Sequence, residues 1–150
     1  MMPHAAYEVL KVIHLFCAIT FVGAVFFEVL VIEPLEKRLP RDLSELLAKE
    51  IPRRVRCFMP YVVGLLFVTG IGMFVHWFKA YGDFFFHSRF GILLTIKASL
   101  AIVVLGIFAN AIYASFKGKM DLCRFRYTHR IVAGFMVGIV LLAKALFWYF

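Results

Sequence analysis

Five side chains with donor nitrogen or sulfur atoms lie within or at the ends of long apolar stretches: His14, Met73, His76, Lys97 and Lys144. A charged group at the centre of a bilayer costs about 2.5 to 3.5 kcal/mol on insertion scales, so such residues usually have a function. Histidine nitrogen binds haem iron and copper, methionine sulfur prefers copper(I), and lysine pairs with carboxylates such as haem propionates. These residue types predict a bound cofactor, either a b-type haem or, as the alternative, copper.

The elements that must position these residues are four apolar runs, at about residues 7–32, 58–77, 90–116 and 131–150. A helix needs about 20 mostly apolar residues to cross a hydrocarbon core of roughly 30 Å. Inside lipid the backbone must be paired internally, and runs this long and continuous can only be helices. Since 63% of the residues are hydrophobic and the mean hydropathy is +0.89, we expect an all-α, polytopic membrane protein. Its single domain, residues 1–150, would be an up-and-down four-helix transmembrane bundle.

The net charge of +8 comes from basic residues between the apolar runs, which form no stripe that would fit a nucleic acid. Lysine and arginine are enriched in cytoplasmic loops. The second connecting segment holds only Lys79 and Arg89, whereas the first and third together hold twelve basic residues. We therefore expect a bacterial-type inner-membrane protein whose first and third loops are cytoplasmic and whose termini are both periplasmic. The twelve are Lys37, Arg38, Arg41, Lys49, Arg53, Arg54, Arg56, Lys117, Lys119, Arg124, Arg126 and Arg130.

The first loop also predicts a short amphipathic helix on the cytoplasmic surface of the membrane. Asp42 and Glu45 form a helix-capping signal, and the leucines around them recur at helical spacing. Pro34 is expected to end the first span, and Pro60 to lie in the first turn of the second, where proline is tolerated. The aromatic second loop, residues 78–89, is either an interfacial belt or a lid over a site.

This topology places four nitrogen-bearing side chains at a similar depth below the outer face. At 1.5 Å per residue, His14 and Lys97 each lie about 10 Å from the outer ends of their spans. His76 ends the second span, and Lys144 lies six residues before the end of the fourth. Four-helix bundles build cofactor sites from side chains on facing helices. A haem would thus use residues from this set, whereas copper(I) would use His14, His76 and Met73.

Several of these residues also have a purely structural explanation. His14 can simply hydrogen-bond a neighbouring helix, and His76 can lie in the membrane interface. Lys97 and Lys144 are both near enough to the outer face for the ammonium group to reach the surface along its flexible stem. These alternatives need no cofactor.

Two further ionisable residues are expected near the cytoplasmic face. Glu28, close to the inner end of the first span, is expected to pair with a basic loop residue such as Arg130. His129, which lies between Arg126 and Arg130, is expected to be part of the charged surface.

Two of the predicted helices resemble segments of known membrane proteins. The first, HLFCAITFVGAVFFEVLVIEP from His14 to Pro34, resembles the opening helix of the copper-resistance protein D (CopD) family. The third, FGILLTIKASLAIVVLGIFANAIY, is similar to the segment of that family with a lysine early in the span. The four-helix plan is also similar to that of the haem-containing J-type protoporphyrinogen oxidases (HemJ). The resemblance implies a functional first-helix histidine and third-helix lysine, which are His14 and Lys97 here.

These expectations leave three functions open. The first is a CopD-like protein with a haem or a copper ion between helices near the outer face, in metal homeostasis or electron transfer. The second is a haem-dependent membrane oxidoreductase that acts on protoporphyrinogen or a quinol. The third is a structural or transporter subunit without a cofactor. Besides the lipid bilayer, other membrane subunits or a second copy in a homodimer are possible partners.

Overall fold

A computed structural model describes residues 3–117 and 122–148, although not the side chains of Leu122 and Phe147. Within these ranges the chain is helical almost throughout and contains no strand. The elements are α1 (His4–Phe27), the π-helical turn η1 (Glu28–Ile32), α2 (Glu33–Glu36), α3 (Arg41–Tyr81), the 3-10 helix η2 (Gly82–His87), α4 (Arg89–Phe116) and α5 (Leu122–Phe147).

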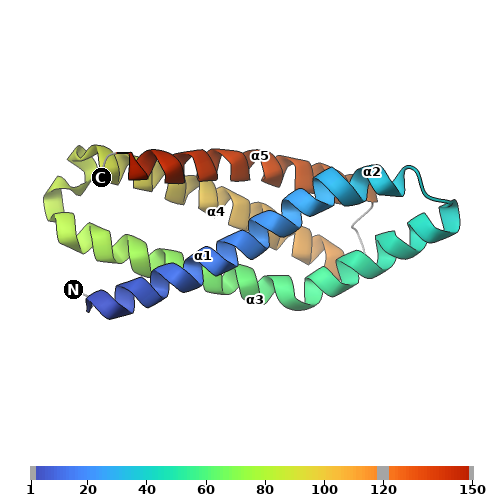
Figure 1. Cartoon of the computed structure of the whole chain (residues 1–150), viewed down its shortest axis with the longest axis horizontal. Helices are drawn as coiled ribbons and strands as arrows, with labels where there is room; N and C mark the ends of the chain where they lie inside the picture. Colours follow the sequence, from blue (N-terminus) through green and yellow to red (C-terminus); the bar gives the residue numbers. More distant parts are fainter. Residues whose placement is uncertain (1–2, 118–121, 149–150) are drawn as a thin grey trace.

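Four helical stretches are long and apolar enough to cross a membrane: His4–Glu36, Arg41–His87, Arg89–Phe116 and Cys123–Leu146. The predicted all-helical class and the four apolar helices are therefore confirmed. Successive long helices run in opposite directions, and the first and last described residues lie toward the same end of the molecule (Figure 1). Many large apolar side chains on these helices are exposed in the isolated chain, as expected for a surface that faces lipid or another subunit.

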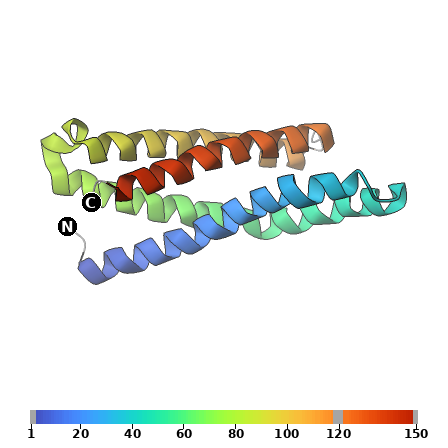
Figure 2. The ribbon, with the colours of Figure 1, turned by 45° about the horizontal axis from the view of Figure 1, so that its top comes forward.

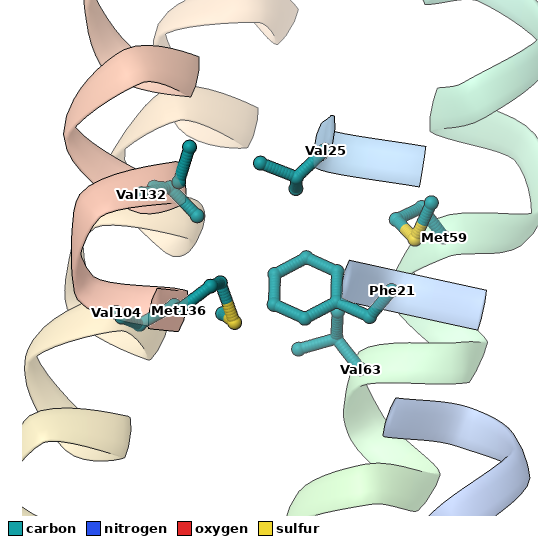
Figure 3. Close-up of a cluster of buried hydrophobic side chains, with 8 residues drawn as sticks. Phe21, Val25, Met59, Val63, Val104, Val132 and Met136 are labelled. Carbon is teal, nitrogen blue, oxygen red and sulfur yellow. The ribbon is translucent and has the colours of Figure 1, made fainter. Parts of the chain in front are cut away.

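The long helices pack as two pairs, α1 along α3 and α4 along α5, and Figure 2 shows the pairs side by side. The pairs meet in one hydrophobic cluster near the middle of the bundle, where Phe21 of α1 points toward the α4 and α5 side chains (Figure 3). Phe21 is 3% exposed, so this layer is closed to solvent. The buried members of the cluster are Phe21, Val25, Met59, Val63, Val104, Val132, Ala133 and Met136.

The first span does not end at Pro34 as predicted, because η1 and α2 continue it to Glu36. A proline inside a helix lacks the N–H that would bond four residues back, and its ring crowds the carbonyl there, here that of Leu30. The wider π-helical turn Glu28–Ile32 lies at this point and relieves the crowding. Helical structure therefore passes through Pro34 without a break.

The short amphipathic cytoplasmic helix is not a separate element. Residues 41–57 instead form the first part of α3, which is 41 residues long and contains both Pro52 and Pro60. Pro60 therefore lies in the helix interior and not in a first turn. The leucine, alanine, lysine, glutamate and arginine residues before Pro52 are good helix formers, which explains why the helix extends beyond the apolar run.

Helix α5 begins at Leu122, nine residues before the predicted start of the fourth span at residue 131. Two ion pairs hold this extra segment against the end of the first span. Arg126 donates to Glu36 over 2.8 Å, and the Arg130 guanidinium binds both carboxylate oxygens of Glu33. The expected pair of Glu28 with Arg130 is therefore wrong, because Glu33 takes the arginine.

The connection η2 between α3 and α4 contains both buried and exposed phenylalanines. Phe85 is fully buried and packs edge-to-face on Phe74 and Phe78, whereas Phe84 and Phe86 are exposed. Ser88 caps α4, because its hydroxyl accepts a hydrogen bond from the Gly91 N–H. The segment thus anchors the end of the bundle and presents phenylalanine rings outward.

Candidate cofactor site

The best-defined polar contact inside the bundle joins His14 of α1 to α3. Its Nδ1 lies 3.0 Å from the Leu66 carbonyl oxygen and 3.0 Å from the Thr69 hydroxyl. A carbonyl oxygen can only accept, and the Thr69 hydroxyl has its own carbonyl acceptor in Leu65 at 2.8 Å. The proton of the neutral ring therefore belongs on Nδ1, and Nε2 keeps its lone pair.

Close packing fixes the position of this ring. A Cβ atom added to Gly70 would lie 3.1 Å from Cε1 of His14, which is tighter than an ordinary side-chain contact. One turn further along the same seam, a Cβ at Gly72 would lie 2.6 Å from Cδ2 of Leu10. The two glycines therefore let α1 approach α3 closely, as small residues do between membrane helices.

Lys97 lies on α4, in the other helix pair. The lysine is half-buried, and the residues that the structure describes form no hydrogen bond or ion pair with it. An amine that lies among apolar helices without a counter-charge can receive an anionic or metal-bound partner.

His76 lies closer to the end of the bundle and has different neighbours. Its ring stacks on Tyr7 at 4.6 Å, and the Tyr7 hydroxyl accepts a hydrogen bond of 2.7 Å from Nε1 of Trp77. The Nδ1 atom of His76 is buried and has no hydrogen-bond partner in the described part of the chain. This imidazole therefore has an unused nitrogen inside an aromatic cluster.

His14 and His76 do not share one coordination sphere. Along the α1–α3 seam, Tyr7 contacts His76 and His14 contacts Gly70, so the two rings are about two helical turns, or roughly 10 Å, apart. A single ion binds imidazole nitrogens at about 2.0 to 2.1 Å. In keeping with this separation, no group of three histidine, cysteine, aspartate or glutamate residues suited to a metal ion exists among the described residues.

The other two predicted site residues differ in exposure. Met73 lies half-buried on α3, between Gly70 and His76 in sequence. Lys144 is exposed near the end of α5, where its ammonium can reach the surface. The structure thus places His14 at the contact between α1 and α3, leaves His76 in a neighbouring aromatic cluster, and places Lys144 at the surface.

The sequence alone did not identify the partners of these residues. Thr69 and the Leu66 carbonyl orient His14, and Tyr7 covers His76. Thr69 is only 4% exposed. It lies seven residues before His76, on the same face of α3, and this spacing could have identified it as a residue of the site. No feature of the sequence predicts the contact between His14 and the Leu66 carbonyl.

No protein-family model matches this chain, and no curated protein or solved structure is significantly similar to it. The function must therefore be inferred from the site itself.

Proposed function

We propose that this chain is a polytopic, CopD-like inner-membrane protein that binds a b-type haem through His14 and takes part in electron transfer. The observation that carries the proposal is the hydrogen bond from Nδ1 of His14 to the Leu66 carbonyl. Histidines that ligate metals usually donate their other ring N–H to a carbonyl or carboxylate, which fixes the ring and makes the ligating nitrogen more basic. His14 has this arrangement already.

The residues around His14 fit a haem better than copper. Nε2 of His14 would bind the haem iron, and Lys97 would either bind the iron as well or pair with a propionate. When bound, the haem supplies one-electron redox chemistry, whose potential depends on the axial ligands and nearby charges. Copper(I) would need Met73 and His76 of α3 together with His14 of α1. These donors are spread over about two helical turns along the contact between the two helices.

The orientation in the membrane rests on the distribution of charge. The basic first and third loops lie at the end of the bundle where Arg126 and Arg130 pair with Glu36 and Glu33. The positive-inside rule places this end in the cytoplasm. His14 and Lys97 then lie in the periplasmic half, near the outer face.

The test is the colour of the purified protein. Protein from haem-replete cells, purified in detergent, should show a Soret band and about one haem per chain. His14→Ala should lose the band, whereas the matched control His87→Ala, in the exposed connection η2, should keep it. A colourless wild-type protein that keeps copper after desalting would instead favour metal handling. A protein with neither would favour a structural subunit.

A further inference from the structure

A second site lies in the other half of the bundle, next to the hydrophobic cluster around Phe21, which is called the Phe21 layer below. A cavity of about 360 Å³ opens there between all four long helices, and its walls are mostly apolar. Phe21 and Phe108 meet edge-to-face at 5.9 Å on its lining, and Phe125 contributes a third ring. A cavity of this size fits a ring-shaped organic molecule.

Two groups that can accept hydrogen bonds face this cavity without a partner. Glu28 lines it from η1, and no described residue forms a hydrogen bond or ion pair with its carboxylate. His129 lines it from α5 and donates from Nδ1 to the Phe125 carbonyl over 2.9 Å, so its Nε2 keeps a lone pair. His129 is therefore half-buried at a cavity and is not simply part of the charged surface, as the sequence suggested.

Positive charge lies on another part of the lining. Arg56 is exposed and is held by hydrogen bonds to the Ser115 hydroxyl at 2.7 Å and the Pro52 carbonyl at 3.2 Å. Lys49 also contributes to the lining. These cations disfavour an amine as the occupant, and the Glu28 carboxylate disfavours an anion.

The geometry points to a binding site for a neutral, lipid-soluble dihydroxyarene, that is, a quinol. Two unpartnered acceptors on different helices require a ligand with two donors, and buried polar groups gain most from a ligand that satisfies them. The apolar walls and three phenylalanines suit an aromatic ring. The membrane supplies such molecules by lateral diffusion among the spans.

The test compares a ligand that has two hydroxyl donors with its bis-methyl ether, in which each donor hydrogen is replaced by a methyl group. Purified protein is titrated calorimetrically with decylhydroquinone, and separately with its bis-methyl ether, under nitrogen with ascorbate. The hydroquinone should bind at least about tenfold more tightly, because the ether leaves both acceptors unpaired. Glu28→Leu and His129→Phe should each reduce this preference, because each leaves only one acceptor, whereas His87→Ala should keep it.

Two results would overturn the assignment. Equal binding of the ether would mean that the cavity takes an acyl chain or detergent only. Unchanged hydroquinone binding in Ala111→Trp, which fills the cavity, would place the ligand elsewhere. If a Glu28 or His129 variant fails to fold, judged by circular dichroism and gel filtration, the other of these two variants and Ala111→Trp decide the question in its place.

The outcome is independent of the haem proposal. His14→Ala should lose the Soret band and still bind hydroquinone, because the Phe21 layer separates the two sites. His129→Phe should keep the Soret band and have a weaker preference for hydroquinone over its ether. Failure of one site therefore does not imply failure of the other.

Discussion

Nδ1 of His14 lies 3.0 Å from the carbonyl oxygen of Leu66, 52 residues further along the chain. This contact sets the ring's orientation and leaves Nε2 as the unprotonated nitrogen. Helix carbonyls normally bond within their own helix, so a side chain that shares one is held in a defined place. The haem proposal depends on this orientation, because Nε2 is the nitrogen that would bind the iron.

Thr69→Val should weaken haem binding about tenfold, because supporting partners of a metal-bound histidine contribute about 10- to 100-fold to affinity. The substitution keeps the shape and removes the hydroxyl 3.0 Å from His14. Haem titration of the apoprotein, followed at the Soret maximum, measures the effect. Thr95→Val is the matched control, since within residues 3–117 and 122–148 that hydroxyl bonds only to the Gly91 carbonyl of its own helix. Equal affinities in the two variants would exclude a role for Thr69.

Gly70→Val should displace the His14 ring and lower the haem occupancy of purified protein. Even a methyl carbon at this position would lie 3.1 Å from the ring, and valine adds two further carbons. Gly64→Val provides the comparison on the same helix, because no atom lies within 4 Å of a Cβ there. Full occupancy in the Gly70 variant would show that the ring does not need its present position.

Lys97→Met should lower the midpoint potential of the haem, because loss of a nearby positive charge favours the oxidised iron. At an effective dielectric constant of 20, two unit charges about 8 to 15 Å apart interact by on the order of 1 to 2 kcal/mol. A spectroelectrochemical titration measures the shift, and a change in the Soret position as well would identify Lys97 as an axial ligand. Lys144→Met, at an exposed position, should leave the potential unchanged. A Lys97 variant with unaltered potential and spectrum would remove this residue from the site.

Arg130→Ala should lower the unfolding temperature of the protein, because the Glu33 carboxylate would keep only its 3.4 Å contact with Lys37. The Glu33 side chain is 5% exposed and loses its two-point partner, although the arginine itself is 57% exposed. Thermal unfolding in detergent, followed by circular dichroism, provides the measurement. Arg124→Ala, an exposed residue of the same helix, should unfold near the wild-type temperature. Equal stabilities would mean that this ion pair contributes nothing.

Thiol labelling in intact cells should establish the orientation. Cys57 and Cys123 are exposed and lie toward the basic end, so a membrane-impermeant maleimide should modify them only after lysis. His87→Cys in the opposite connection should be modified before lysis. Labelling of Cys123 in intact cells would reverse the proposed topology.

The sequence predicted the four spans because each depends on a long apolar run. It also placed His14 and Lys97 at one level, because helix geometry turns residue number into depth. No hydrogen bond or ion pair joins the two side chains within the described part of the chain, so their common depth stays a prediction.

The ends of the helices were predicted less well, because they depend on contacts between distant residues. Glu33 and Glu36 are buried only because Arg126 and Arg130 reach them from α5. The sequence instead predicted Glu28 as the partner of a basic loop residue such as Arg130. The cavity beside Glu28 and His129 was also missed, since it is formed by side chains of four helices that meet only in the fold.

Hyperfine spectroscopy of the ferric haem, with histidine labelled by ¹⁵N, tests the central proposal most directly. A coupled histidine nitrogen should appear in the wild-type protein and in His76→Ala, and should be absent from His14→Ala. A spectrum without histidine nitrogen, or one that His14→Ala leaves unchanged, would contradict ligation by His14.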